Sequence, residues 1–314
     1  MTTLIFTHPA CMEHDPGPGH PESPARLKAV LEALHAPQFA ALAWREARRA
    51  SGAEIERVHD RAYIAEVMAA VPQAGRVSLD LDTAVSPGSG EAALRAAGAL
   101  CGAVDAVAAG EGGNAFCAVR PPGHHARPAQ GMGFCIFNSI AVAARYAQRQ
   151  HGIGKVMIAD WDVHHGNGTQ DTFYEDGSVF FFSTHQWPWY PGTGPASETG
   201  EGAGKGTTMN RPFPAGAGRA QIVGAFREDL RRAADQFKPE LVLISAGFDS
   251  RLGDPLGGFR LSDQDFTDLT ATMLEVAGKH AGGRLVSILE GGYDLDGLAA
   301  ATVAHVRALV GGSA

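Results

Sequence analysis

The stretch KVMIADWDVHHGNGTQ, residues 155–170, carries the feature on which the fold of this chain depends. Its first part is a continuous apolar run, which is typical of a strand buried on both faces of a sheet. The run ends in two carboxylates and two imidazoles within six residues, namely Asp160, Asp162, His164 and His165. The stretch therefore predicts a buried strand that delivers titratable side chains at its carboxyl end.

Other short apolar runs share this character, and helical patterns lie between them. The expected strands cover residues 3–7, 115–119, 155–160, 178–184, 241–247 and 284–292. The expected helices cover residues 24–35, 90–110, 139–152, 220–237, 262–283 and 296–312. This alternation predicts an α/β fold with a doubly wound parallel sheet and helices on both faces. No linker or repeat divides the chain, so we expect a single domain over residues 1–314, with a long functional loop over 186–218.

Composition narrows the class of protein. The chain has 314 residues, a net charge of −8 and no run of Lys or Arg, so we do not expect a nucleic-acid partner. The four cysteines form no CxxC pair, which argues against a cysteine-rich zinc site or a disulfide framework. No signal-peptide pattern opens the sequence, and no window has the roughly 18 apolar residues of a membrane span. We expect a cytoplasmic protein without a membrane partner.

Polar residues also follow three further expected strands. They are His124 and His125 in RPPGHHA, Asp249 in SAGFDS and Tyr293 in LEGGYD. In open α/β sheets, ligands bind beyond the carboxyl ends of the strands. These side chains are therefore expected to meet at one edge of the sheet.

The spacing within the first stretch indicates a metal site. Asp162 and His164 are two residues apart, so in an extended backbone they point to the same side. Asp249 could complete a set of two carboxylates and one imidazole, which leaves room for water and substrate as catalytic zinc sites do. Such an oxygen-rich set would also accept Fe²⁺, Co²⁺ or Mn²⁺.

Several motifs resemble those of the histone deacetylases and their bacterial relatives, within the arginase/deacetylase superfamily. The motifs are RPPGHHA, GFCIFNSIAVAA, DWDVHHGNGTQ, YPGTG, SAGFDS and LEGGYD. The resemblance extends over nearly the whole chain, and HPES with WDVHHGNGTQ is similar to the class II branch, which includes acetylpolyamine amidohydrolases. It implies the arginase/deacetylase fold, and the compact chain suggests a bacterial origin.

The resemblance also implies roles for the residues at the strand ends. Zinc would be held by Asp162, His164 and Asp249. His125 would act as the general base, and His124 would assist electrostatically or help to protonate the leaving amine. Tyr293 would donate its phenol to the developing oxyanion.

A structural monovalent cation, potassium by the family pattern, is implied behind the zinc site. Asp160 would hydrogen-bond His124, and the cation would be held by oxygens of Asp160, Asp162, His164, Ser183 and Thr184. A second such site would lie around Phe173, Asp176 and Val179. These groups would fix the orientation of the ligands.

One position separates the branches of the family. Asn167 stands where class I enzymes place an aspartate behind the general-base histidine. An amide fixes the ring but adds no negative charge that would raise the pKa of the histidine. We therefore predict that His125 is neutral near pH 7, the form that a base needs.

A narrow channel would lead the acyl chain to the metal. By the family pattern its walls would come from Gly133, Phe134, Tyr190 and Leu256, with Asp82 at the rim and Arg26 at an acetate cavity below the metal. Polyamine-specific relatives have an acidic residue where this chain has Leu256, so an apolar residue there favours acyl-lysine. Four residues of an N-terminal loop, Glu13, His14, Asp15 and Glu22, could add acidity at the rim and keep the polyamine alternative open.

The sequence thus predicts a zinc-dependent amidohydrolase that removes acetyl or similar short acyl groups from amines. Acetyl-lysine of a protein or peptide is the expected substrate, and a small acetylated amine such as an acetylpolyamine is the alternative. A binuclear manganese enzyme of the arginase type would need a further aspartate where Gly166 stands. An inactive acyl-lysine binding module is a further alternative, which the complete set of ligands, histidines and Tyr293 opposes.

Overall fold

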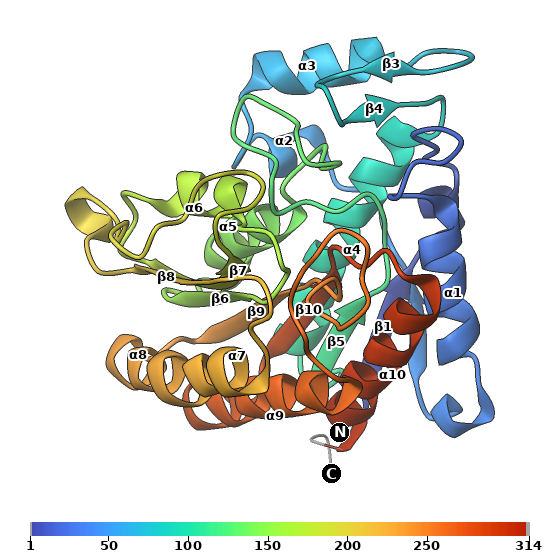
Figure 1. Ribbon diagram of the computed structural model, residues 1–314. Coiled ribbons are helices and arrows are strands. Elements are labelled where there is room, and N and C mark those ends of the chain that lie inside the picture. The colour runs from blue at the N-terminus through green and yellow to red at the C-terminus, as the bar shows by residue number, and fades with distance from the viewer. Residues whose placement is uncertain (1, 312–314) are drawn as a thin grey trace.

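The computed structural model describes residues 2–311, and its centre is an eight-stranded sheet (Figure 1). The strands are β1 (Thr3–Thr7), β2 (Ala43–Glu46), β5 (Asn114–Cys117), β6 (Val156–Asp160), β7 (Val179–Gln186), β8 (Thr208–Phe213), β9 (Leu241–Ala246) and β10 (Leu285–Leu289). They are all parallel and run in the order β2-β1-β5-β10-β9-β6-β7-β8. The last strand in the sequence, β10, is therefore inserted between β5 and β9 in the middle of the sheet.

All six expected strands are present, and the two edge strands are additional. Strand β2 is half-buried to exposed, and β8 lies inside the segment 186–218 for which the sequence predicts a loop. That prediction is wrong for Thr208–Phe213, because an edge strand has no continuous apolar run to reveal it. Pro212 within β8 cannot donate a ladder hydrogen bond, and an edge position tolerates this loss.

Helices cover both faces of the sheet, as the alternating pattern predicts (Figure 1). On one face α4 (Ser89–Ala108) packs along α5 (Ser139–His151). On the other face α9 (Asp263–His280) packs along α10 (Leu295–Gly311), and α1 (Pro24–Leu34) lies against α10. Residue 312, the last of the expected final helix, lies outside the described residues.

The expected helix over 220–237 is interrupted by a π-helical turn. It consists of α7 (Arg219–Ala225), the turn Phe226–Leu230 and α8 (Arg231–Phe237). Smaller elements are α2 (Gly52–Ile55), α3 (Arg61–Ala70), α6 (Asn167–Phe173) and a hairpin of β3 (Val77–Ser78) and β4 (Ala84–Val85). None of the described helices has the length and apolar content that crossing a membrane requires.

Local sequence explains why these elements begin and end where they do. Every residue of β6 is buried, as its apolar run predicts. Helix α5 begins after Asn138, whose Oδ1 accepts a hydrogen bond from the Ala141 N–H at 3.1 Å. It ends at Gly152, which has a φ of +64° that glycine adopts without strain.

The strand order brings the expected functional segments together. Strands β5, β10, β9 and β6 are consecutive neighbours in the sheet. Each of them is followed by one of the segments that carry candidate catalytic or metal-binding residues. Parallel strands end at the same edge, so the loops after these four strands converge there.

Candidate active site

The three predicted metal ligands meet at the carboxyl ends of β6 and β9. Asp162, His164 and Asp249 are buried, and one ligand atom of each lies within 4.8 Å of the others. His164 Nδ1 lies 3.0 Å from Asp162 Oδ1 and 3.2 Å from Asp249 Oδ2. Two carboxylates and one imidazole are a three-ligand set of the kind that holds a catalytic metal with an open position.

Backbone hydrogen bonds and two glycines hold these carboxylates in place. The Val163 N–H donates to Asp249 Oδ1, and the Gly291 N–H donates to Asp162 Oδ2, both at 2.8 Å. A Cβ atom at Gly247 would lie 2.1 Å from Asp162 Oδ2, and one at Gly291 would lie 2.1 Å from Asp249 Oδ2. Only glycine leaves the space that the carboxylates occupy.

The pKa values in this cluster reflect its crowding. Burial opposes a charged imidazole, but hydrogen bonds to Asp162 and Asp249 raise the pKa of His164 to about 10. Burial and the neighbouring Asp162 raise the pKa of Asp249 to about 8. Two buried carboxylates thus lie beside one imidazole, and a divalent cation would neutralise the negative charge that they share. The residues present therefore fit a divalent metal ion.

The adjacent residues His124 and His125, which follow β5, have opposite surroundings. His124 Nδ1 lies 2.9 Å from Asp160 Oδ2, whereas His125 Nδ1 lies 2.8 Å from Asn167 Oδ1. Burial opposes the charge on His124, but Asp160 raises the pKa of His124 well above its usual range. Burial and the neighbouring charge of His124 lower the pKa of His125 well below its usual range. His124 is therefore the charged member of the pair and His125 the neutral one.

Asn167 determines which nitrogen of His125 carries the proton. Its Oδ1 faces the ring, while its Nδ2 faces Met132 Sδ at 3.5 Å. An amide oxygen accepts only, so His125 Nδ1 is the donor and Nε2 keeps a free lone pair. The structure thus places Asn167 behind His125, where the sequence predicts it.

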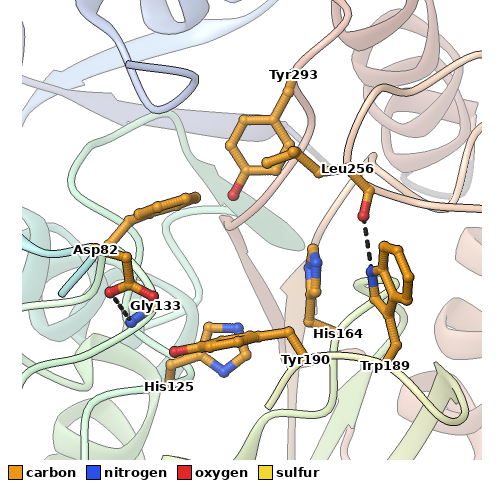
Figure 2. A pocket seen from close by; sticks show the side chains of 9 residues that line it. Asp82, His125, Gly133, His164, Trp189, Tyr190, Leu256 and Tyr293 are labelled. Atoms are coloured by element: carbon orange, nitrogen blue, oxygen red, sulfur yellow. Dashed lines mark hydrogen bonds between the residues drawn. The ribbon is translucent and has the colours of Figure 1, made fainter.

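A cavity of about 210 Å³ reaches the metal cluster at His164 (Figure 2). It is lined by Asp82, His125, Gly133, Phe134, His164, Trp189, Tyr190, Leu256 and Tyr293. Every residue that the sequence predicts for the channel is in this set, and Trp189 is added to it. The ring of Tyr190 lies 5.2 Å from that of His125, and the ring of Phe134 lies 5.9 Å from that of Tyr293. Aromatic walls suit an extended methylene chain.

Tyr293 lies across the cavity from His125, and its hydroxyl points into the cavity (Figure 2). Burial raises the pKa of Tyr293 well above its usual range, so the phenol keeps its proton. The guanidinium of Arg26 lies 4.8 Å from the centre of the Tyr293 ring, and its Nε donates to the Gly292 carbonyl at 2.6 Å. Arg26 therefore supports the segment that carries Tyr293, and its predicted place at an acetate cavity stays a prediction.

Of the four N-terminal residues expected at the rim, Glu13 is exposed but does not line the cavity, whereas the other three are buried or paired and do not add free acidity there. Glu22 is fully buried, and its carboxylate lies 3.0 Å from Arg26 Nη1 and 2.5 Å from Arg120 Nε. His14 is buried and hydrogen-bonds Ser89, while Asp15 pairs with Arg76. The partner Arg120 is far from Glu22 in the sequence, so the pattern around HPES could not reveal that this acid is neutralised.

The oxygens expected to hold a monovalent cation lie where β6 and β7 end side by side. Asp160 pairs in register with Ser183. Thr184 Oγ1 is buried without a hydrogen-bond partner among the described residues. A buried orphan oxygen of this kind is commonly satisfied by an ion or a water. The first cation site stays a prediction, and this hydroxyl fits it.

The second expected cation site, at Phe173, Asp176 and Val179, has a different environment. The Asp176 carboxylate pairs with Arg145, whose guanidinium lies 4.7 Å from the centre of the Phe173 ring. A cation there would meet an existing positive charge. This site also stays a prediction.

Two further buried residues lie near the histidines: Glu290, which was not identified from the sequence, and His165, to which the sequence assigns no chemistry. Glu290 accepts hydrogen bonds from the Gly123 N–H at 2.7 Å and the His124 N–H at 3.2 Å, and burial raises the pKa of Glu290 to about 7. His165 lies 2.8 Å from Thr193 Oγ1, which anchors the YPGTG loop. The place of Glu290 inside LEGGYD, three residues before Tyr293, is the signal that could have identified it.

The fold and the site together define an α/β protein with a candidate metal centre at the carboxyl ends of its parallel strands. A model of the histone deacetylase domain matches residues 20–309, so the chain belongs to the histone deacetylase family. The chain is 43% identical to the rice (Oryza sativa subsp. japonica) protein "Histone deacetylase 10, chloroplastic" over 98% of this chain and 73% of that protein.

Two further comparisons agree with this assignment. The chain is 38% identical to the human protein "Polyamine deacetylase HDAC10", over 99% of this chain and 46% of that protein. Among solved structures, the HDA15 HD domain superimposes with a TM-score of 0.94 at 35% identity and covers 99% of this chain and 88% of that one.

Proposed function

We propose that this protein is a zinc-dependent deacetylase that hydrolyses acetyl-lysine side chains of proteins or peptides. The observation that carries the proposal is the convergence of three groups on one cavity. His164 of the metal cluster, the neutral imidazole of His125 and the protonated phenol of Tyr293 all line it. Family membership supports hydrolysis of an acylated amine.

The metal-binding residues would be Asp162, His164 and Asp249. A bound divalent ion lowers the pKa of a water and polarises the acyl carbonyl. Zinc suits this set of ligands, and Fe²⁺ or Co²⁺ also fit it. Potassium in the first monovalent site would add positive charge behind Asp160.

The two histidines divide the proton transfers between them. His125 is neutral with a free Nε2 lone pair, so it can take the proton of the attacking water. His124 is held in its charged form by Asp160, so it stabilises negative charge and can protonate the leaving amine. The opposite pKa shifts of two neighbouring groups match these acid and base roles.

Tyr293 supplies the hydrogen bond that the transition state needs. Its raised pKa keeps the phenol protonated, so it can donate to the oxygen on which charge develops. Arg26 and Gly292 hold the segment behind it.

The cavity wall favours an acyl-lysine substrate. Leu256, Phe134 and Tyr190 present apolar or aromatic surface to a methylene chain. The acids Glu22 and Asp15, which could attract a polyamine, are paired with arginines.

One observation favours a second candidate, the deacetylation of small acetylated amines. Asp82 lines the cavity beside Gly133, whose N–H it accepts at 2.9 Å (Figure 2). Its remaining oxygen could bind either the amides of a peptide or the ammonium of a polyamine. The similarity to the human protein "Polyamine deacetylase HDAC10" is consistent with this second candidate function.

Steady-state kinetics of the zinc-loaded enzyme on an acetyl-lysine peptide and on acetylputrescine test the proposal. We expect kcat/KM to be at least about tenfold higher for the peptide, because an apolar wall offers no counter-charge to a second ammonium. A thousandfold preference for the diamine would reject acetyl-lysine as the substrate. No hydrolysis of either compound by metal-loaded enzyme would reject the deacetylase function.

A further inference from the structure

A single carboxylate connects the cavity wall with the segment that carries Tyr293. Asp254, in the loop after β9, is only 8% exposed. Its Oδ1 accepts the Leu256 N–H at 2.9 Å, and its Oδ2 accepts the N–H groups of Tyr293 at 2.7 Å and Asp294 at 3.3 Å. Two carboxylate oxygens offer enough acceptor sites for all three donors. Asp254 thus joins two loops that are almost 40 residues apart.

Leu256 is held from its other side as well. Its carbonyl accepts a hydrogen bond from Trp189 Nε1 at 2.9 Å (Figure 2). The Trp189 side chain is 47% exposed, so burial alone does not fix it. The backbone of Leu256 is therefore bound on both sides, by Asp254 at its N–H and by Trp189 at its carbonyl.

The segment before Tyr293 depends on such anchors. Gly292 has a φ of +122°, a conformation that other residues rarely adopt. Gly291 precedes it, so two glycines lead into the tyrosine with little conformational restriction of their own. Arg26 holds the Gly292 carbonyl, and Asp254 holds the Tyr293 N–H. The position of the phenol thus depends on bonds to other loops.

We propose that Asp254 is a positioning residue that couples the Leu256 wall of the cavity to the catalytic position of Tyr293. A substrate that pushes Leu256 aside pulls on the carboxylate that holds the Tyr293 backbone, so a poor fit at the wall lowers kcat as well as raising KM. Trp189 is the outer anchor of the same connection. The inference rests on the proposed function in the assignment of Tyr293 to catalysis, but the coupling between the loops is independent of it.

Amide hydrogen exchange measured by mass spectrometry tests the coupling without reference to activity. Trp189→Phe keeps an aromatic ring but removes the donor to Leu256. We expect faster exchange in peptides covering 250–258, which contain the residue that Trp189 binds. We also expect faster exchange in peptides covering 290–294, to which Trp189 makes no hydrogen bond, so that an effect there must pass through the loop of Leu256. Unchanged exchange over 290–294 would overturn the coupling, whatever the enzyme does to substrates.

A double-mutant cycle on kcat then tests the catalytic consequence. Asp254→Asn turns one acceptor oxygen into a donor, so we expect kcat to fall on the order of tenfold with a small change in KM. Tyr293→Phe should lower kcat by about 100-fold. The double variant should match Tyr293→Phe within about twofold, because a misplaced phenol and an absent one have the same effect. Fully multiplicative effects would overturn the positioning role.

The control is Asp265→Asn at the start of α9. Asp265 is 3% exposed and accepts hydrogen bonds from Ser262, so its replacement disturbs a comparable carboxylate away from the cavity. We expect it to leave kcat and the exchange over 290–294 unchanged. If Asp254→Asn does not fold, the cycle is run with Trp189→Phe in its place, and full multiplicativity with Tyr293→Phe then counts against the proposal. An inactive wild-type enzyme whose exchange is nevertheless coupled would refute the proposed function alone.

Discussion

The floor and the wall of the cavity differ in how their residues are held. By the floor we mean His164, which lines the inner end of the cavity, and the titratable residues behind it. These residues are His124, Asp160, Asp162, Asp249 and Glu290, and all six are buried and hydrogen-bonded. The wall consists of Phe134, Trp189, Tyr190 and Leu256, and two of these side chains are 47% and 37% exposed. A change in the floor leaves a buried charge without its partner, whereas a change in the wall alters mainly shape and polarity. The floor and the wall therefore differ in how strongly a substitution should act, although Asp254 connects the Leu256 wall to the segment of Tyr293.

The largest loss of activity is expected when one of the proposed metal-binding carboxylates of the floor is removed. Asp249→Asn takes away one of two metal-binding carboxylates, so metal content should fall and kcat/KM should drop by about 1,000-fold or more. Elemental analysis together with acetyl-lysine kinetics measures both quantities. Asp265→Asn is the matched control and should keep metal and activity. Full metal content in Asp249→Asn would contradict the assignment of the ligand.

The second prediction concerns the floor histidine. In Asp160→Asn, His124 loses the carboxylate that raises its pKa, so we expect kcat to fall about 10- to 100-fold. The sign of the pH effect follows from the shift: a lower pKa means that the imidazolium is lost at lower pH, so the basic limb of the pH–rate profile moves to lower pH. An unmoved basic limb would show that His124 does not act in its charged form.

At the border of floor and wall, Asn167→Asp should shift the pH–rate profile on its acidic side. A carboxylate 2.8 Å from His125 Nδ1 favours the imidazolium and raises the pKa of His125. Because the base must be neutral, activity at low pH should be lost, and the acidic limb should move upward by about one unit or more. An unchanged acidic limb would contradict the role of His125 as the base.

The smallest effect is expected from Leu256→Glu, which changes the charge of the wall but keeps the backbone hydrogen bonds of residue 256 to Asp254 and Trp189. In Leu256→Glu a carboxylate enters the cavity, so the ratio of kcat/KM for acetylputrescine to that for the acetyl-lysine peptide should rise about tenfold. Leu252→Glu is the control, because Leu252 belongs to the same loop, is 54% exposed and does not line the cavity. Equal ratios in the two variants would show that the wall does not select the substrate.

The floor was largely predictable from the sequence, and the wall less so. Asp162 and His164 stand two residues apart after a buried strand, so their common direction follows from strand geometry alone. Asp249 and Tyr293 follow strands of the same sheet, and the strand pattern brings them to the same edge. The apolar strands were predictable for a related reason, since burial on both faces leaves a continuous apolar run.

The features of the site that could not be predicted from the sequence depend on contacts between residues far apart in the chain. Glu22 looks like a surface acid in HPES, but Arg120, its partner, is 98 residues away. Trp189 donates a hydrogen bond to the main-chain carbonyl of Leu256, which is 67 residues away in the sequence. Such a bond requires no particular side chain at position 256, so the sequence carries no sign of it. The edge strands β2 and β8 bury only part of their surface, so their patterns resemble loops.

The central position of β10 in the sheet affects when the sheet can form during synthesis of the chain. A chain made from its N-terminus contains β2, β1 and β5 on one side and β9, β6, β7 and β8 on the other before β10 exists. Until β10 is inserted, the two halves of the sheet present open edges to each other and to other chains. Glu290 and Tyr293 directly follow this strand in the sequence. A nascent or C-terminally truncated chain that lacks β10 therefore contains the three proposed metal-binding residues but not these two residues of the site. The strand that joins the two halves of the sheet is thus also the one that brings in the last residues of the proposed active site.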